Sequence, residues 1–88
     1  MNKILINLYV PNLNQHYDLF IPVNEFIWKI NKLVVKSISD LSDGKLLMNQ
    51  NYVIANIETG KIYDNNDIVI NTDITLLLNN VILILDRK

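Results

Sequence analysis

The chain begins with two segments in which apolar and polar residues alternate. Apolar side chains recur at every second position between Lys3 and Val10, which is the spacing of a strand with one buried face. A second alternating run extends from His16 to Ile21, and the residues between the two runs, Pro11 to Asn14, favour a turn. The pattern therefore predicts an antiparallel hairpin at the start of the chain.

The apolar spacing becomes helical after Pro22. From Phe26 to Leu41, apolar residues recur every three or four positions, as on one face of a helix. Asn24 is expected to cap this helix, with Glu25 in its first turn, and Ser42-Asp43-Gly44 is expected to end it. The predicted buried stripe consists of Ile27, Ile30, Val34, Ile38 and Leu41.

Shorter elements follow in the second half. A third strand is expected over Tyr52 to Ile57, a short strand at Ile62-Tyr63, and an apolar return over Ile68 to Ile70. The run from Val81 to Leu85 is continuously apolar, which is typical of a central strand buried on both faces.

The order of these elements predicts the topology. The most economical way to bury the last, wholly apolar strand is at the centre of the sheet, beside the first strand, and a right-handed crossover makes that pair parallel. This is an α+β, β-grasp arrangement: a mixed sheet of four to five strands with one main helix on one face, in a single domain over residues 1–88. The segment Thr75 to Leu78 then leads as a loop into the last strand, although Ile74 to Leu78 and Val81 to Leu85 also fit a hairpin with a type I′ turn at Asn79-Asn80.

The composition of the chain excludes several classes of function. The net charge is -1 over 88 residues, so no excess of positive charge is present to bind nucleic acid. The chain has no cysteine, which excludes disulfides, thiolate metal sites and cysteine nucleophiles. No apolar stretch approaches the roughly 18–20 residues that span a bilayer, and the first strand lacks the features of a signal peptide. We therefore expect a cytoplasmic protein without direct membrane insertion.

The ionisable residues predict neither a catalytic nor a metal site. His16 is the only histidine, and no serine or cysteine nucleophile accompanies it in a recognisable arrangement. The segment Asp64-Asn65-Asn66-Asp67 lacks the central glycine and the bidentate glutamate of a calcium loop. We interpret these carboxylates, together with Glu58 and Asp73, as parts of solvated turns, and we expect no cofactor.

Two stretches combine apolar spacing with a few polar residues. The first contains Tyr17-Asp18-Leu19, Ile21-Pro22, Ile27, Ile30, Leu33-Val34 and Ser37-Ile38, and the second contains Gly60-Lys61-Ile62-Tyr63, Asn66-Asp67, Val69-Ile70 and Asp73-Ile74. Together they resemble the YukD/EsaB family, small ubiquitin-like proteins encoded in type VII (WXG100) secretion loci of low-GC Gram-positive bacteria. The chain departs from the family at Thr75 to Leu78, where a short apolar insertion precedes the polar turn.

The resemblance implies a non-enzymatic accessory or regulatory protein that docks onto a type VII secretion component or a regulator. Ubiquitin and the sulfur-carrier β-grasp proteins end in Gly-Gly, whereas this chain ends Leu85-Asp86-Arg87-Lys88, so we expect no conjugation. A sulfur carrier is accordingly the disfavoured alternative. An unrelated small β-grasp interaction module is a further alternative that the sequence leaves open.

Several apolar positions are candidates for contact with a partner. Trp28 and Val35 project together from the helix, whose apolar arc is wider than the roughly 100° that packing on one sheet requires. The connection containing Leu46, Leu47 and Met48 is expected to cover part of that arc. The alternative for Trp28 is burial under its own chain.

Other candidate surfaces lie elsewhere on the fold. The outer face of the sheet is expected to expose Leu5, Tyr9 and Phe20, and the loop before the last strand offers Leu76 and Leu77, with burial in the fold as their alternative. Lys29, Lys32 and Lys36 form a candidate basic helix face, which is otherwise a solvated surface. A homodimer formed through the same apolar patches is possible.

Overall fold

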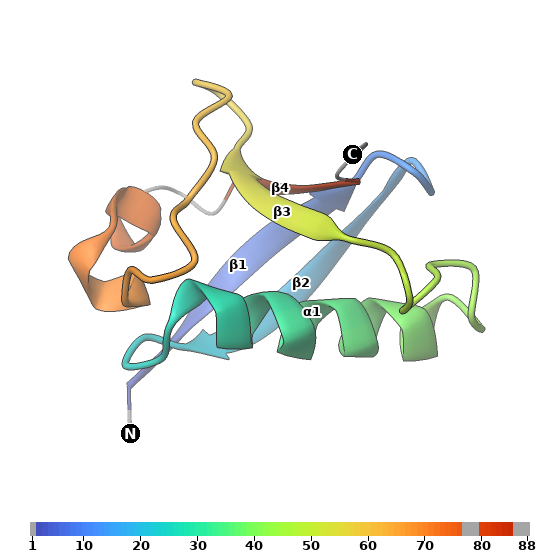
Figure 1. Ribbon diagram of the computed structural model, residues 1–88, viewed down its shortest axis with the longest axis horizontal. Coiled ribbons are helices and arrows are strands. Elements are labelled where there is room, and N and C mark those ends of the chain that lie inside the picture. The colour runs from blue at the N-terminus through green and yellow to red at the C-terminus, as the bar shows by residue number, and fades with distance from the viewer. Residues whose placement is uncertain (1, 77–79, 86–88) are drawn as a thin grey trace.

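The computed structural model describes residues 2–76 and 80–85 (Figure 1). Within these residues, a four-stranded sheet carries one α-helix on one face, and two short 3-10 helices lie near the start of that helix. The elements in chain order are β1 (Lys3–Val10), β2 (Gln15–Pro22), α1 (Ile27–Leu41), β3 (Tyr52–Asn56), η1 (Val69–Asn71), η2 (Asp73–Thr75) and β4 (Asn80–Leu85).

The strand order is β2-β1-β4-β3. β4 runs parallel to β1, with Leu8 opposite Val81, and antiparallel to β3, with Ile54 opposite Leu83. The last strand therefore lies in the middle of the sheet, beside the first strand and in the same direction. This is the β-grasp arrangement, and it confirms the predicted fold class.

The first hairpin follows the alternating pattern. β1 and β2 pair from Lys3 opposite Pro22 to Val10 opposite Gln15. The inward residues Ile6, Leu8 and Val10 are buried against the helix layer. Asn14 closes the turn at a φ of 51°, a left-handed conformation that asparagine tolerates better than most residues.

The buried face of α1 contains four of the five residues of the predicted stripe, Ile27, Ile30, Val34 and Ile38. Leu41, the fifth residue, is 61% exposed because it is the last residue of the helix. The predicted stop is confirmed: Ser42 is the C-cap, and Gly44 has a φ of 80° and donates its N–H to the Ser39 carbonyl at 2.7 Å.

The predicted start of the helix is wrong. Phe26, not Asn24, is the N-cap, and its side chain makes no capping hydrogen bond. The reason is tertiary: residues 23–25 form a turn and a bend that lie beside residues 68–70, and Phe26 forms an isolated bridge with Ile68. The first helical N–H groups instead donate to loop carbonyls, Ile27 to Asp67 at 2.8 Å and Trp28 to Asn65 at 3.2 Å.

The short elements after β3 also differ from the prediction. β3 ends at Asn56, because the Asn56 side chain accepts hydrogen bonds from the N–H groups of Glu58 and Thr59 and starts a turn. Ile62 forms only an isolated bridge with Ala55 and no strand. The apolar return at residues 68–70 is a bridge followed by the η1 helix.

The central strand is buried on one face only. Val81 and Leu83 are buried beneath the helix layer, whereas Ile82 and Ile84 are partly exposed. The prediction of two-sided burial is wrong because α1 covers a single face of the sheet (Figure 1).

The segment before β4 contains no strand in its described part. Ile74 is buried within η2, and Leu76 lies in a turn. The hairpin interpretation is therefore wrong for residues 74–76, while Leu77, Leu78 and Asn79 lie outside the described residues.

Candidate docking surfaces

A groove of about 590 Å³ opens between α1 and β3. Trp28 lies at the end nearest the start of the helix, beside Asn65, and Met48 and Gln50 lie toward the opposite end. The side chains of Val35, Tyr52 and Val53 provide apolar lining between them. We call this feature the Trp28 groove.

Trp28 has the mixed surroundings of a contact residue. It is 38% exposed, and its ring lies parallel to that of Phe26 with centroids 6.4 Å apart. The ammonium groups of Lys29 and Lys32 lie 5.6 and 5.5 Å from the Trp28 ring centroid, which is within cation–π range. The indole is therefore held in place by its neighbours while part of it remains accessible to a ligand.

Val35 contributes less surface than predicted. Its side chain is 6% exposed, so it supports the groove as a buried wall beside Trp28. The following connection covers the helix only through Leu46, which is buried, while Leu47 and Met48 are 55% and 57% exposed. The expected covering of the helix is thus confirmed for Leu46 alone.

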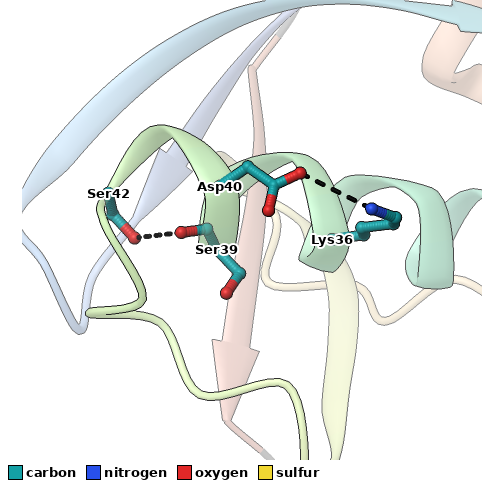
Figure 2. Close-up of polar contacts among 4 residues, drawn as sticks. All are labelled: Lys36, Ser39, Asp40 and Ser42. Atoms are coloured by element: carbon teal, nitrogen blue, oxygen red, sulfur yellow. Dashed lines mark hydrogen bonds and ion pairs between the residues drawn. The ribbon is translucent and has the colours of Figure 1, made fainter.

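The basic helix face is partly paired. Lys29 lies 3.7 Å from Glu25, and Lys36 Nζ lies 3.6 Å from Asp40 Oδ2 (Figure 2). Exposed i,i+4 pairs of this kind contribute only about 0.3–0.5 kcal/mol, so both lysines can exchange these partners at little cost. Among the described residues, no carboxylate lies within 4.0 Å of Lys32.

The wall opposite Trp28 is fixed by hydrogen bonds. Asn31 Nδ2 donates to the Tyr52 carbonyl at 2.7 Å and joins α1 to β3. The Tyr52 hydroxyl donates to the Leu47 carbonyl at 2.7 Å, and burial raises the pKa of Tyr52. The groove is consequently preformed by the fold.

The outer face of the sheet brings together two of its three predicted residues. Leu5 and Phe20 are cross-strand partners and are 43% and 67% exposed. Tyr9 is separated from them by polar side chains: Asn7 donates to Asp18 at 2.9 Å, and Asn7 Oδ1 lies 2.9 Å from His16 Nδ1. Tyr9 instead packs on the His16 ring, with centroids 4.7 Å apart.

Ile82 and Ile62 also lie on this outer face and were not predicted there from the sequence. The strand register places Ile82 beside Tyr9 on one side and beside Ala55 on the other, and Ala55 is bridged to Ile62. Ile62 is 55% exposed. Burial alternates along β4, and this alternation places Ile82 on the outer face. The sequence of β4 does not alternate, so Ile82 could be assigned to that face only after the structure showed that α1 covers the other face.

Leu76 is 83% exposed, so the expectation of its possible burial is wrong. Leu77, the other candidate in this loop, lies outside the described residues.

The carboxylates considered for a cation site are engaged in local structure. Asp64 Oδ1 accepts the Asn66 N–H at 2.8 Å, and Asp73 Oδ1 accepts the Tyr63 hydroxyl at 2.7 Å. In the described part of the chain, no three His, Asp or Glu side chains gather as a metal site would require. No helix in that part is long and apolar enough to cross a membrane.

Comparison with known proteins finds no protein-family model and no curated protein that matches this sequence. The fold and the surfaces described above are the basis on which a function can be proposed.

Proposed function

We propose that this chain is a non-enzymatic β-grasp docking module, an accessory or regulatory protein of a bacterial type VII secretion system. The observation that carries the docking proposal is the Trp28 groove. It combines a preformed hollow, a partly exposed tryptophan and neighbouring lysines on one side of a small rigid fold. Tryptophan is one of the residue types enriched among side chains that dominate binding energy at interfaces.

The resemblance of the sequence to the YukD/EsaB family is what supports the assignment to a type VII secretion system. In this proposal the chain acts in the cytoplasm, and its partner is a component of the secretion machine or a factor that regulates its expression. The chain contributes a rigid binding surface and no chemistry of its own.

Deletion of the gene in its native host tests this proposal. We expect the export of WXG100 substrates into the medium to fall when the gene is deleted and to recover when the wild-type gene is restored. Immunoblots of culture medium and cells measure exported and retained substrate. Unchanged export and unchanged substrate levels after deletion would contradict the assignment to type VII secretion.

Restoration with Trp28→Ala tests the groove within the same experiment. We expect this variant not to restore export, because it removes the main apolar contact of the groove. Leu41→Ala, which truncates an exposed apolar residue at the other end of α1 and outside the groove, is the matched control and should restore export.

The Trp28→Ala variant must also remain folded. Trp28 lies at the surface, so we expect its truncation to lower the free energy of unfolding by only about 1 kcal/mol. Thermal unfolding followed by circular dichroism measures this loss. A loss of several kcal/mol together with intact export would assign Trp28 to the stability of the fold instead.

A further inference from the structure

We infer that the Trp28 groove receives an acidic peptide segment of a partner protein, which places an apolar side chain on Trp28 and carboxylates beside Lys32 and Lys36. This inference rests on the proposed docking function and names the chemistry of the docked segment. It follows from the charge, the shape and the lining of the groove.

The groove has a charge that the whole chain does not have. Its lining includes the ammonium groups of Lys32 and Lys36 and no aspartate or glutamate, with Lys29 beside Trp28. The net charge of the chain is -1, so the groove lining is more positive than the chain as a whole, and Lys29 and Lys36 can give up their exposed partners Glu25 and Asp40 at little cost. An acidic segment is the complementary partner.

Lys29 and Lys32 both place an ammonium group within 5.6 Å of the same indole ring. Two like charges held around one ring repel each other, and only Lys29 has a carboxylate neighbour among the described residues, Glu25. A carboxylate from the ligand next to Lys32 would relieve this repulsion. An apolar side chain of the same ligand would cover the exposed part of the indole.

The shape favours a peptide over a second kind of anionic partner, a lipid membrane. The site is a hollow of about 590 Å³ between a helix and a strand, which a chain segment can enter and a flat bilayer surface cannot. The amide side chains of Gln50, Asn51 and Asn65 line it, and amides can hydrogen-bond to the backbone of a bound peptide.

Trp28 is the only tryptophan of the chain, so its fluorescence reports directly on the groove. The probe is a synthetic peptide with leucine and phenylalanine between two runs of glutamate. We expect a saturable blue shift of the emission, because the apolar side chain removes water from the indole, and weaker binding at higher salt. A peptide with lysine in place of glutamate, and one with alanine in place of leucine and phenylalanine, should bind at least about tenfold more weakly.

Two charge-reversal variants localise the binding. Lys32→Glu replaces an attraction by a repulsion and should weaken binding about tenfold. Lys3→Glu makes the same change of net charge on an exposed outer-face position of β1 and should bind the peptide as the wild type does. Both lysines are exposed, and circular dichroism verifies that each variant is folded.

Three results would overturn the inference. The first is the absence of a saturable shift with the acidic peptide, and the second is equal binding by Lys32→Glu. The third is a shift that the peptide does not produce but another partner does. A shift with vesicles of phosphatidylglycerol would assign the groove to a membrane, and a shift on raising the protein concentration would assign it to a second copy of the chain. A negative peptide result with a normal loss of export on gene deletion would leave the proposed function intact and reject only this ligand.

Discussion

Tyr63 connects β3 to the η2 helix. Its side chain is 3% exposed, its N–H donates to the Ile54 carbonyl at 2.9 Å, and its hydroxyl donates to Asp73 Oδ1 at 2.7 Å. Burial, followed by the hydrogen bond and the charge of Asp73, raises the pKa of Tyr63 well above its usual value of 10.0. The phenol is therefore neutral in the folded protein over a wider pH range than in the unfolded chain.

This raised pKa predicts a loss of stability in alkali. The contribution of Tyr63 is fully present below pH 10.0 and declines as the pH rises from there toward the folded-state pKa, because only the unfolded chain gains by ionising in that interval. Urea unfolding of the wild type and of Tyr63→Phe across this range measures the effect. At neutral pH we expect Tyr63→Phe to be less stable by about 1 kcal/mol, and above pH 10.0 the difference should shrink.

A wild-type advantage that stays constant through this range would contradict the assigned cause. Tyr52, whose pKa burial also raises, is present in both proteins, so its titration cancels in the comparison.

At the scale of single residues, the sequence identified Trp28 as a candidate contact residue, with burial as the alternative, but did not predict its surroundings. Helical spacing places Trp28 and Val35 on one side of the helix, yet Val35 is buried and Trp28 is not. The difference arises because Val35 belongs to the buried core cluster, whereas Trp28 lies beside Asn65 in the loop before η1. Contacts between elements distant in sequence decide such cases, and periodicity within one helix carries no information about them.

At the scale of elements, the start of α1 depends on the loop of residues 64–67. This loop supplies two carbonyls to the first N–H groups of the helix, a task that capping side chains usually perform. The loop is itself ordered by Asp64, whose side chain accepts the Asn66 N–H and whose carbonyl accepts the Asp67 N–H at 3.1 Å.

We therefore expect Asp64→Ala to loosen the beginning of the helix from a distance. Loss of the side-chain hydrogen bond should cost about 0.5–1.5 kcal/mol. Hydrogen exchange followed by NMR should show faster exchange of the Ile27 and Trp28 amides. Asp40→Ala, near the other end of α1, is the control and should leave these two amides unchanged.

This dependence explains why the helix boundary was predicted incorrectly. Asn24 and Glu25 are residue types that favour a helix start, so local rules place it two residues too early. The pairing of residues 23–26 with residues 68–70 overrides those rules. The end of the helix was predicted correctly because Gly44 permits the left-handed backbone locally, without help from another element.

At the scale of the whole molecule, the sequence predicted the topology through a single feature, the apolar run at the end of the chain. That run is apolar throughout, which favours an inner position, and its pairing with β1 on one side and β3 on the other gives the order β2-β1-β4-β3. The exposed outer face could not be predicted in the same way. A continuous apolar run contains no polar position to mark the side that faces solvent.

The two faces of β4 should therefore differ in their sensitivity to truncation. Leu83 is 1% exposed beneath the helix, and we expect Leu83→Ala to cost about 2–5 kcal/mol. Ile82 points to the opposite, outer face and is partly exposed, so Ile82→Ala should lower the free energy of unfolding by only about 1 kcal/mol. Chemical denaturation measures both losses, and equal losses would show that the outer face is covered in solution.

The parallel pairing of β1 with β4 also sets the moment at which the protein can fold during synthesis. Translation proceeds at about 5–20 residues per second, so β1 and β2 emerge from the ribosome seconds before the strand that completes their sheet. Until residue 85 has emerged, the nascent chain has no central strand and exposes the apolar face that α1 and β4 later share. Folding of this sheet is consequently delayed until β4 has emerged, and chaperones have that interval in which to bind the nascent chain.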